Sequence, residues 1–139
     1  AMNAAAEALE IRRELAKANP QAFLPYLAGS LNNLGNMLSD LGRRQEAMNA
    51  AAEALEIRRE LAKANPQAFL PDLAMSLNNL GSMLSDLGRR QEACEKWLEA
   101  LKVIEPFYKQ YPQAFEHYWT VITDNIRKHC DSSVEAGVG

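Results

Sequence analysis

The chain is poor in aromatic residues, which make up 7% of its 139 positions, although 47% of the positions are hydrophobic. Alanine and leucine supply most of the apolar content. The chain also lacks a basic excess, because 15 lysines and arginines stand against 18 acidic residues and leave a net charge of −3. Nucleic-acid binders normally carry clustered basic residues, so this balance argues against such a partner. No apolar run approaches the roughly 20 residues that a membrane span needs, so no membrane partner is predicted.

Cysteine and histidine are scarce as well. Cys94 and Cys130 form no C-x-x-C pair and have no histidine at zinc-ligand spacing on both sides. This pattern favours two reduced thiols in a cytoplasmic protein, and no charged-then-apolar signal segment opens the chain. The two histidines, His117 and His129, belong to no catalytic or phosphate-binding motif. The sequence therefore predicts no enzyme activity, no cofactor and no metal site.

An internal repeat dominates what is present. Residues 1–46 align without a gap with residues 47–92. The two copies differ at three positions, which are Tyr26/Asp72, Gly29/Met75 and Asn36/Ser82. A third copy over 93–130 is partial and divergent, but it keeps the Pro-Gln-Ala-Phe connector and Asn125. We expect one tandem-repeat domain over 1–130, which begins inside the second helix of a unit and looks excised from a longer array, and a flexible tail over 131–139.

Each unit contains two helical patterns. In the first, leucines recur every three or four residues from Leu73 to Leu87, which makes one apolar stripe. Pro71 suits the first turn of this helix, and Gly88 suits a left-handed cap after its end. The second helix ends before Pro66, because a residue that precedes proline resists the α conformation. The predicted helices are 2–18, 25–41, 44–64, 71–87, 90–110 and 113–130.

The connections between these helices are short, so neighbouring helices should be antiparallel hairpins. One hairpin cannot bury its apolar face alone, and stacked copies would bury a continuous core. The fold class predicted is therefore all-α, as an open solenoid. A closed four-helix bundle is the alternative, but near-identical units favour translation along an axis.

The repeat unit resembles the tetratricopeptide repeat, in the longer variety seen in kinesin light chains and in many bacterial signalling proteins. The residues that carry the resemblance are Leu31, Leu34, Gly35, Leu38, Gly42, Ala47, Ala51, Ala54 and Leu55. The unit exceeds the ordinary length of about 34 residues by roughly a dozen. The resemblance implies a right-handed αα superhelix of about six antiparallel helices. It also implies a scaffold that binds a protein or peptide partner in a concave groove.

One face of the first helix of each unit is polar, opposite the leucine stripe. Its candidate peptide-binding residues are Asn32, Asn33, Asn36, Asp40, Asn78, Asn79, Ser82 and Asp86, with Asn125 in the third copy. In the family resembled, this face lines the groove, and an asparagine amide offers a donor and an acceptor to a peptide main chain. Asn33, Asn79 and Asn125 occupy matching positions and would form a ladder. An ordinary solvated helix face is the competing interpretation.

Two further interpretations stay open. The near-perfect duplication is also compatible with a structural or engineered array that has no ligand of its own. The alanine- and leucine-rich face of helix 2–18 could drive formation of a homodimer. The Arg-Arg pairs, balanced by nearby glutamates, are interpreted as solvated helix surface.

Overall fold

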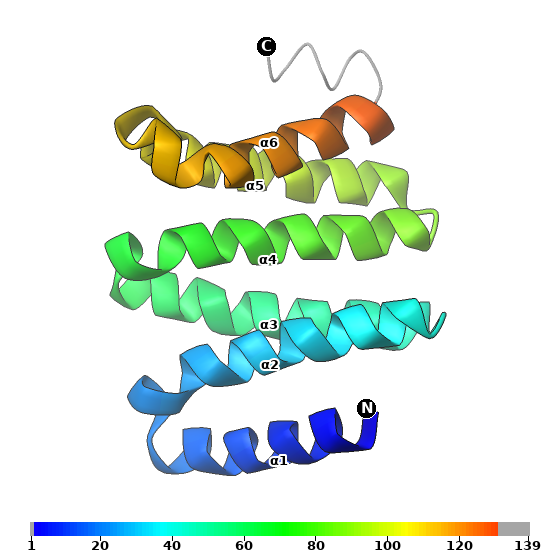
Figure 1. Ribbon diagram of the computed structural model, residues 1–139, viewed down its shortest axis with the longest axis vertical. Helices are drawn as coiled ribbons and strands as arrows, with labels where there is room; N and C mark the ends of the chain where they lie inside the picture. Colours follow the sequence, from blue (N-terminus) through cyan, green and yellow to red (C-terminus); the bar gives the residue numbers. More distant parts are fainter. Residues whose placement is uncertain (1, 131–139) are drawn as a thin grey trace.

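The computed structural model describes residues 2–130, and the predicted tail over 131–139 lies outside them. The described part of the chain is helical throughout, apart from short connections (Figure 1). Its helices are α1 (Met2–Ala18), α2 (Pro20–Asp40), α3 (Arg44–Ala64), α4 (Pro66–Asp86), α5 (Arg90–Gln110) and α6 (Pro112–His129). The all-α class and the number of helices predicted from the sequence are confirmed for residues 2–130.

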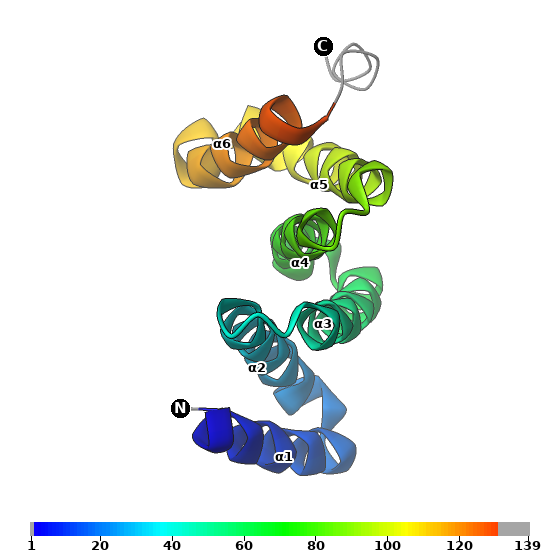
Figure 2. The ribbon, with the colours of Figure 1, turned by 90° about the vertical axis from the view of Figure 1, so that its right-hand side faces the viewer.

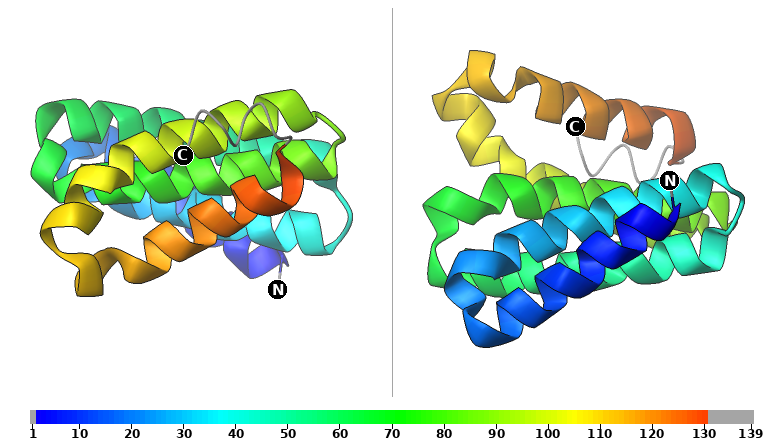
Figure 3. Two further views of the ribbon diagram at one scale, coloured as in Figure 1. Left: turned by 90° about the horizontal axis from the view of Figure 1, so that it is seen from above. Right: turned by 60° about the horizontal axis from the view of Figure 1, so that its bottom comes forward.

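Successive helices run in opposite directions and stack along one axis (Figure 1). Seen along the helices, α2 and α6 lie farther to the left than α4, while α3 and α5 lie to the right (Figure 2). The row formed by α2, α4 and α6 is therefore concave. The end helices are inclined to those in the middle, so the stack twists as it lengthens (Figure 3). This arrangement is an open helical-repeat solenoid and not a closed four-helix bundle.

The starts of α2 and α4 differ from the prediction. The sequence predicts Pro25 and Pro71 in the first turn, but Pro20 and Pro66 occupy that position and the helices begin five residues earlier. Asn65 precedes Pro66 and accepts a hydrogen bond at its side chain from the backbone N–H of Ala68 at 3.4 Å. An asparagine cap followed by a proline whose missing N–H costs nothing is a strong helix start.

Pro25 and Pro71 consequently lie inside their helices. Each removes the hydrogen bond to the carbonyl four residues earlier, which belongs to Gln21 or Gln67. Both glutamines are exposed, so water can satisfy these carbonyls. Pro106 likewise lies inside α5, which continues to Gln110. The prolines are tolerated because they stand where solvent replaces the lost bond.

The turns after α2 and α4 were predicted correctly. Gly42 and Gly88 have φ of 78° and 80°, the left-handed conformation that glycine adopts without steric cost. The backbone N–H of Gly42 donates to the carbonyl of Ser39, and that of Arg43 donates to the carbonyl of Leu38. These two bonds form a Schellman motif, which ends the helix and turns the chain into α3.

The core runs along the stack as two clusters of buried side chains. Residues of α3 to α6 dominate the larger cluster, and residues of α1 to α3 form the smaller one. Ala47, Ala54 and Ala93 are fully buried, which lets neighbouring helices approach closely. Gly35 acts in the same way, since a Cβ there would stand 3.2 Å from the carbonyl oxygen of Ala47. The small residues at these positions therefore allow the close approach of α2 and α3.

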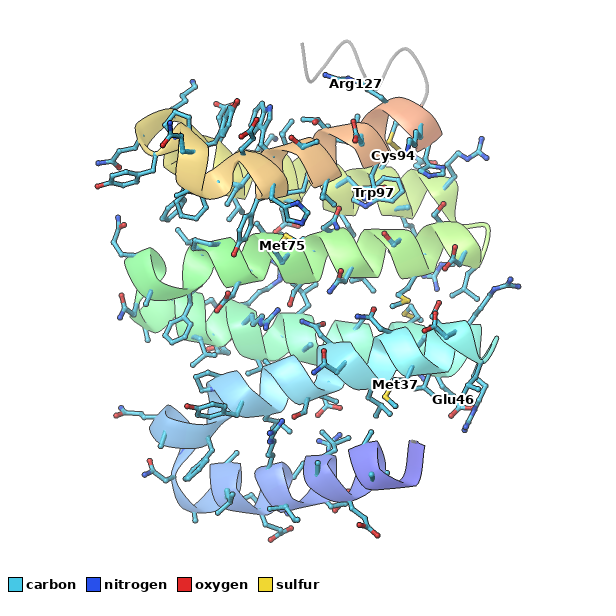
Figure 4. The ribbon with its side chains drawn as sticks, in the orientation of Figure 1. Met37, Glu46, Met75, Cys94, Trp97 and Arg127 are labelled. Atoms are coloured by element: carbon cyan, nitrogen blue, oxygen red, sulfur yellow. A yellow bond between two sulfur atoms is a disulfide. The ribbon has the colours of Figure 1, made fainter. Side chains whose placement is uncertain are left out.

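The last hairpin is closed by a covalent bond. Cys94 and Cys130 are buried and form a disulfide, with their Cα atoms 5.9 Å apart (Figure 4). The prediction of two reduced thiols is wrong, because the C-terminal end of α6 folds back against the first turns of α5. The linear sequence, in which the two residues are 36 apart, gave no signal of this proximity.

Within residues 2–130, none of the helices combines the length and apolar character required to cross a membrane.

Candidate functional site

The candidate site is the concave row, and it can be described by helix geometry. On α2, residues 26, 29, 33, 36 and 40 fall within an arc of about 80°, because each residue advances by about 100° around the axis. The matching positions on α4 are 72, 75, 79, 82 and 86. We call these ten positions, together with Asn125 on α6, the inner face. Met75 marks its middle on α4 (Figure 4).

Most predicted residues of the inner face are accessible. Asn33, Asn36, Asp40 and Asp86 are exposed. Asn79, Ser82 and Asn125 are half-buried. In the described part of the chain, no hydrogen bond engages the side chains of Asn33 or Asn79. Each of these two amides therefore keeps its donors and its acceptor for a ligand.

Asn32 and Asn78 do not belong to this accessible set. Their exposed fractions are 8% and 5%, so the prediction that they line an open face is wrong. The reason is the packing of successive units: both residues lean toward the next helix of the row. Nδ2 of Asn32 donates to Oγ of Ser76 at 3.4 Å, and within residues 2–130 no hydrogen bond engages Oδ1 of Asn32.

The predicted asparagine ladder is also altered at its third member. Nδ2 of Asn125 donates to Oδ1 of Asn78 at 2.8 Å, which ties α6 to α4. Asn125 is thus partly engaged in holding the stack together. Ser82 is engaged too, since its hydroxyl donates to the carbonyl of Asn78 at 3.2 Å. The free amides of the ladder are those of Asn33 and Asn79.

An arginine lies beneath the inner face. Nη1 of Arg58 on α3 donates to Oγ of Ser76 at 3.0 Å and to the carbonyl oxygen of Asp72 at 3.5 Å. Burial lowers the pKa of Arg58, while the negative charge of Asp72 opposes this shift. Arg12 makes the equivalent bond to Ser30 in the preceding unit. These arginines hold the second helix of one unit to the first helix of the next.

A second set of arginines links the second helix of one unit to the second helix of the next, which are α1, α3 and α5. Both terminal nitrogens of Arg59 donate to the carboxylate of Glu99, at 2.6 and 3.1 Å. The hydrogen bond from Arg59 lowers the pKa of Glu99, against the opposing effect of burial. Arg13 binds Glu53 in the same bidentate way, at 2.5 and 3.0 Å. The hydrogen bond with Glu53 raises the pKa of Arg13.

The interpretation of the Arg-Arg pairs as solvated surface is therefore wrong for these residues. It holds for Arg43 and Arg89, whose partners Glu46 and Glu92 lie one helical turn away on an exposed surface. A signal was present in the sequence. Arg58 and Ser76 are both replaced in the third copy, by Ile104 and Ile122, and both isoleucines are fully buried. A paired replacement of polar by apolar residues indicates contact between the two positions.

Trp97 on α5 packs between α4 and α6. Its indole is 1% exposed, stacks on the ring of His129 with centroids 5.4 Å apart, and donates from Nε1 to the carbonyl of Asn78 at 3.2 Å (Figure 4). Trp97 therefore fills the space between α5 and the terminal helix α6. Its partner on α4 is Gly81, where no side chain would fit.

Other surface features do not coincide with the inner face. An open hollow of about 750 Å³ lies at the connection between α5 and α6 and is lined by residues 110–114. No group of three or more His, Cys, Asp or Glu within the described residues could hold a metal ion. The chemistry available on the inner face is therefore hydrogen bonding by amides, together with carboxylate charge.

Comparison with known proteins supplies the family. A search among curated proteins returned no match to this chain. A sequence model described as tetratricopeptide repeat matches residues 27–67 and 73–105, which is more than half of the chain. The matched segments cover α3 and most of α2, α4 and α5, the helices that carry the inner face and its support. The chain therefore belongs to the tetratricopeptide repeat family, whose members are generally scaffolds for protein interaction.

Proposed function

We propose that this protein is a scaffold whose inner face binds an extended segment of a partner protein. The observation that carries the proposal is the pair Asn33 and Asn79. They occupy matching positions in adjacent units, lie on one concave row, and have amides that the fold does not use. An amide can bond both the N–H and the C=O of a peptide, so two amides at a regular interval suit an extended main chain.

Three features of the fold support this proposal. Buried clusters run along the whole stack, so packing within the chain defines the shape of the row. Arg58 and Arg59 brace successive units from behind. Asn125 extends the row onto α6, although its Nδ2 is bonded to Asn78.

The test uses peptides selected from a random library of about a dozen residues in extended form. Their affinity for the wild-type chain is measured by fluorescence anisotropy and compared with that for the double variant Asn33→Ala, Asn79→Ala. We expect a loss of about tenfold or more, which corresponds to the loss of two hydrogen bonds to the peptide. Asn49→Ala is the matched control, because Asn49 is exposed on α3, away from the inner face.

The competing proposal is a structural or engineered array without a ligand. It predicts that no library peptide binds the wild-type chain above background. It is also favoured if the double variant binds the selected peptides as tightly as the wild type does. Either result would remove the proposed scaffold function of the inner face.

A specific observation also supports self-association through α1. Ile11 and Leu15 are 61% and 40% exposed, whereas the equivalent Ile57 and Leu61 of α3 are half-buried. We propose that a second copy of the chain covers this apolar face. Sedimentation over a concentration series should show a dimer that Ile11→Glu, Leu15→Glu abolishes, and a monomer at every concentration would contradict the proposal.

Two finer predictions also stay proposals. The 46-residue unit supports the longer, kinesin-light-chain-like variety of the repeat. A cytoplasmic location was favoured by the expectation of free thiols, but the disulfide between Cys94 and Cys130 counts against it, because such bonds are rare in cytosolic proteins. The redox state of the two cysteines in purified native protein would test the location.

A further inference from the structure

The differences between the two matching units share one place in the fold. Units 1–46 and 47–92 differ at Tyr26/Asp72, Gly29/Met75 and Asn36/Ser82. In each helix, the second and third of these positions follow the first by three and by ten residues. All of them therefore lie within the arc of about 80° that defines the inner face. Every difference between the units therefore lies on the inner face.

Tolerance of exposed positions does not explain this restriction. Glu56, Glu60 and Lys63 on α3 are exposed, and they are identical to their counterparts in the first unit. The exposed connections on either side of α4 are identical as well. A recent duplication explains the identities, but it does not explain why the replacements avoid the rest of the surface. Selection on the inner face would explain it.

The replacements also differ in chemical character. At 26/72 a phenol is replaced by a carboxylate, and at 29/75 a glycine is replaced by a long thioether side chain. Asn33 and Asn79 lie among them and are the same in both units. A surface with constant amides and variable neighbours has two parts: one that binds any main chain and one that distinguishes side chains.

We propose that positions 26/72, 29/75 and 36/82 determine which segment the inner face binds, and that its partner is an extended protein segment with basic and apolar side chains. This inference rests on the proposed scaffold function. It adds the residues that select the partner and the chemistry of that partner.

Charge supports the basic character of the segment. Asp40, Asp72 and Asp86 belong to the inner face, and within residues 2–130 no ion pair engages their carboxylates. Arg58 donates to Ser76 and to the backbone of Asp72 from below, so its guanidinium is committed to the stack. A lysine or arginine of the partner would meet the carboxylates of Asp40 and Asp86 along α2 and α4. The charge of Arg58 partly compensates that of Asp72.

The other side chains of the face add to this preference. Tyr26 is 60% exposed, and a Cβ at its neighbour Gly29 would meet no atom within 4 Å, so the ring stands beside open space. A phenol face in that setting can receive an arginine or lysine by cation–π attraction. Met75 is half-buried, and its flexible thioether suits an apolar side chain of variable shape. The inner faces of α2 and α4 would thus bind two different parts of one segment.

The chain provides its own matched variants. The triple exchange Asp72→Tyr, Met75→Gly, Ser82→Asn gives α4 the face of α2, and Tyr26→Asp, Gly29→Met, Asn36→Ser gives α2 the face of α4. Each introduced residue already occurs at the equivalent position of the other unit, so the fold is expected to tolerate it. Glu56→Gln, Lys63→Gln on α3 is the control for surface changes away from the inner face.

The probes are peptides of about a dozen residues selected from a random library on the wild-type chain, and the readout is fluorescence anisotropy. We expect the selected peptides to be enriched in Lys and Arg. We also expect their affinity to fall by about tenfold or more with at least one of the two exchanges and not with the control. Melting temperatures of the variants identify any loss that is due to unfolding.

Each other outcome has a distinct meaning. Peptides that lose binding with Asn33→Ala, Asn79→Ala but bind both exchanges as tightly as the wild type would overturn this inference and leave the proposed function standing. Selected peptides that are not enriched in basic residues would overturn the partner chemistry. The absence of any peptide that binds above background would overturn both proposals.

Discussion

Gly81 on α4 lies directly against the indole of Trp97 on α5. A Cβ built at Gly81 would stand 2.5 Å from Nε1 of Trp97 and 2.8 Å from its Cδ1. The ring cannot retreat freely, because it is almost fully buried, stacks on His129 and donates a hydrogen bond to the carbonyl of Asn78. The absence of a Cβ at Gly81 therefore allows Trp97 of α5 to pack directly against α4.

The first prediction compares three glycine variants. Gly81→Ala should destabilise the fold by about 1–3 kcal/mol, because the ring must move in a well-packed core. Gly29→Ala should stabilise it by about 0.5–1 kcal/mol, since alanine is the better helix former and a Cβ at Gly29 meets no atom within 4 Å. Gly35→Ala should fall between the two, because its Cβ would lie 3.2 Å from the carbonyl oxygen of Ala47. The measurement is urea unfolding followed by circular dichroism, and any other order would contradict this account of the packing.

Much of this architecture was accessible from the sequence, because the information is local and repeated. The leucine stripes predicted the helices, and Gly42 and Gly88 predicted the turns. The predicted starts of α2 and α4 are five residues too late. The leucine pattern favours Pro25 and Pro71 as the first-turn prolines, but Pro20 and Pro66 occupy the first turn. Where two prolines compete for a helix start, the asparagine before Pro66 is the better signal.

The candidate site was predicted less well, because the spacing of residues along one helix does not show which other helices pack against it. Periodicity alone places Asn32 beside Asn33, but only the packing of α4 against α2 buries Asn32 and leaves Asn33 open. The disulfide and the Arg59–Glu99 pair depend on contacts between residues that are 36 and 40 positions apart. Such contacts follow from how the units are stacked, and the sequence of one unit does not define that geometry.

The second prediction concerns pH. The pKa of Glu99 is lower in the folded protein than its ordinary value because Arg59 donates hydrogen bonds to the carboxylate. Its contribution to stability is therefore present above the unfolded pKa and is lost as the pH falls through the folded pKa. Glu99→Gln should cost about 0.5–1 kcal/mol at pH 7, a small value because the carboxylate is partly exposed.

The pH series has an internal control in the same repeat. Glu60 forms an exposed pair with Lys63 one turn away, so Glu60→Gln should change the free energy of unfolding little at any pH. The wild type and Glu99→Gln should converge when the pH falls below the folded pKa of Glu99. A constant difference between them down to that pH would mean that Glu99 acts through packing and not through its charge.

The third prediction concerns the disulfide. Reduction of Cys94–Cys130, or Cys94→Ser together with Cys130→Ser, should destabilise the α5–α6 hairpin by up to about 3–4 kcal/mol, the entropy of a closed loop of 36 residues. In a solenoid each unit contacts mainly its neighbours, so the loss should remain local. Hydrogen exchange should accelerate in α6 and change little in α1 and α2. A dithiol reductant should have no effect on the double variant, and equal acceleration along the whole chain would contradict a local role.

The last prediction separates two equivalent asparagines. Oδ1 of Asn78 accepts a hydrogen bond from Asn125 at 2.8 Å. Oδ1 of Asn32, in contrast, is buried with no hydrogen-bond partner among residues 2–130, and its Nδ2 makes only a 3.4 Å contact with Ser76. Asn78→Ala should therefore cost about 1–2 kcal/mol, because it leaves Asn125 unpaired in a half-buried setting. Asn32→Ala removes an amide whose burial without good hydrogen bonds destabilises the folded state, so the change in the free energy of unfolding should be close to zero. Both substitutions delete the same atoms from matching positions of near-identical units, so differences in helix propensity and side-chain size cancel. Equal costs in urea unfolding would show that the link between Asn78 and Asn125 contributes nothing to the joining of α4 and α6.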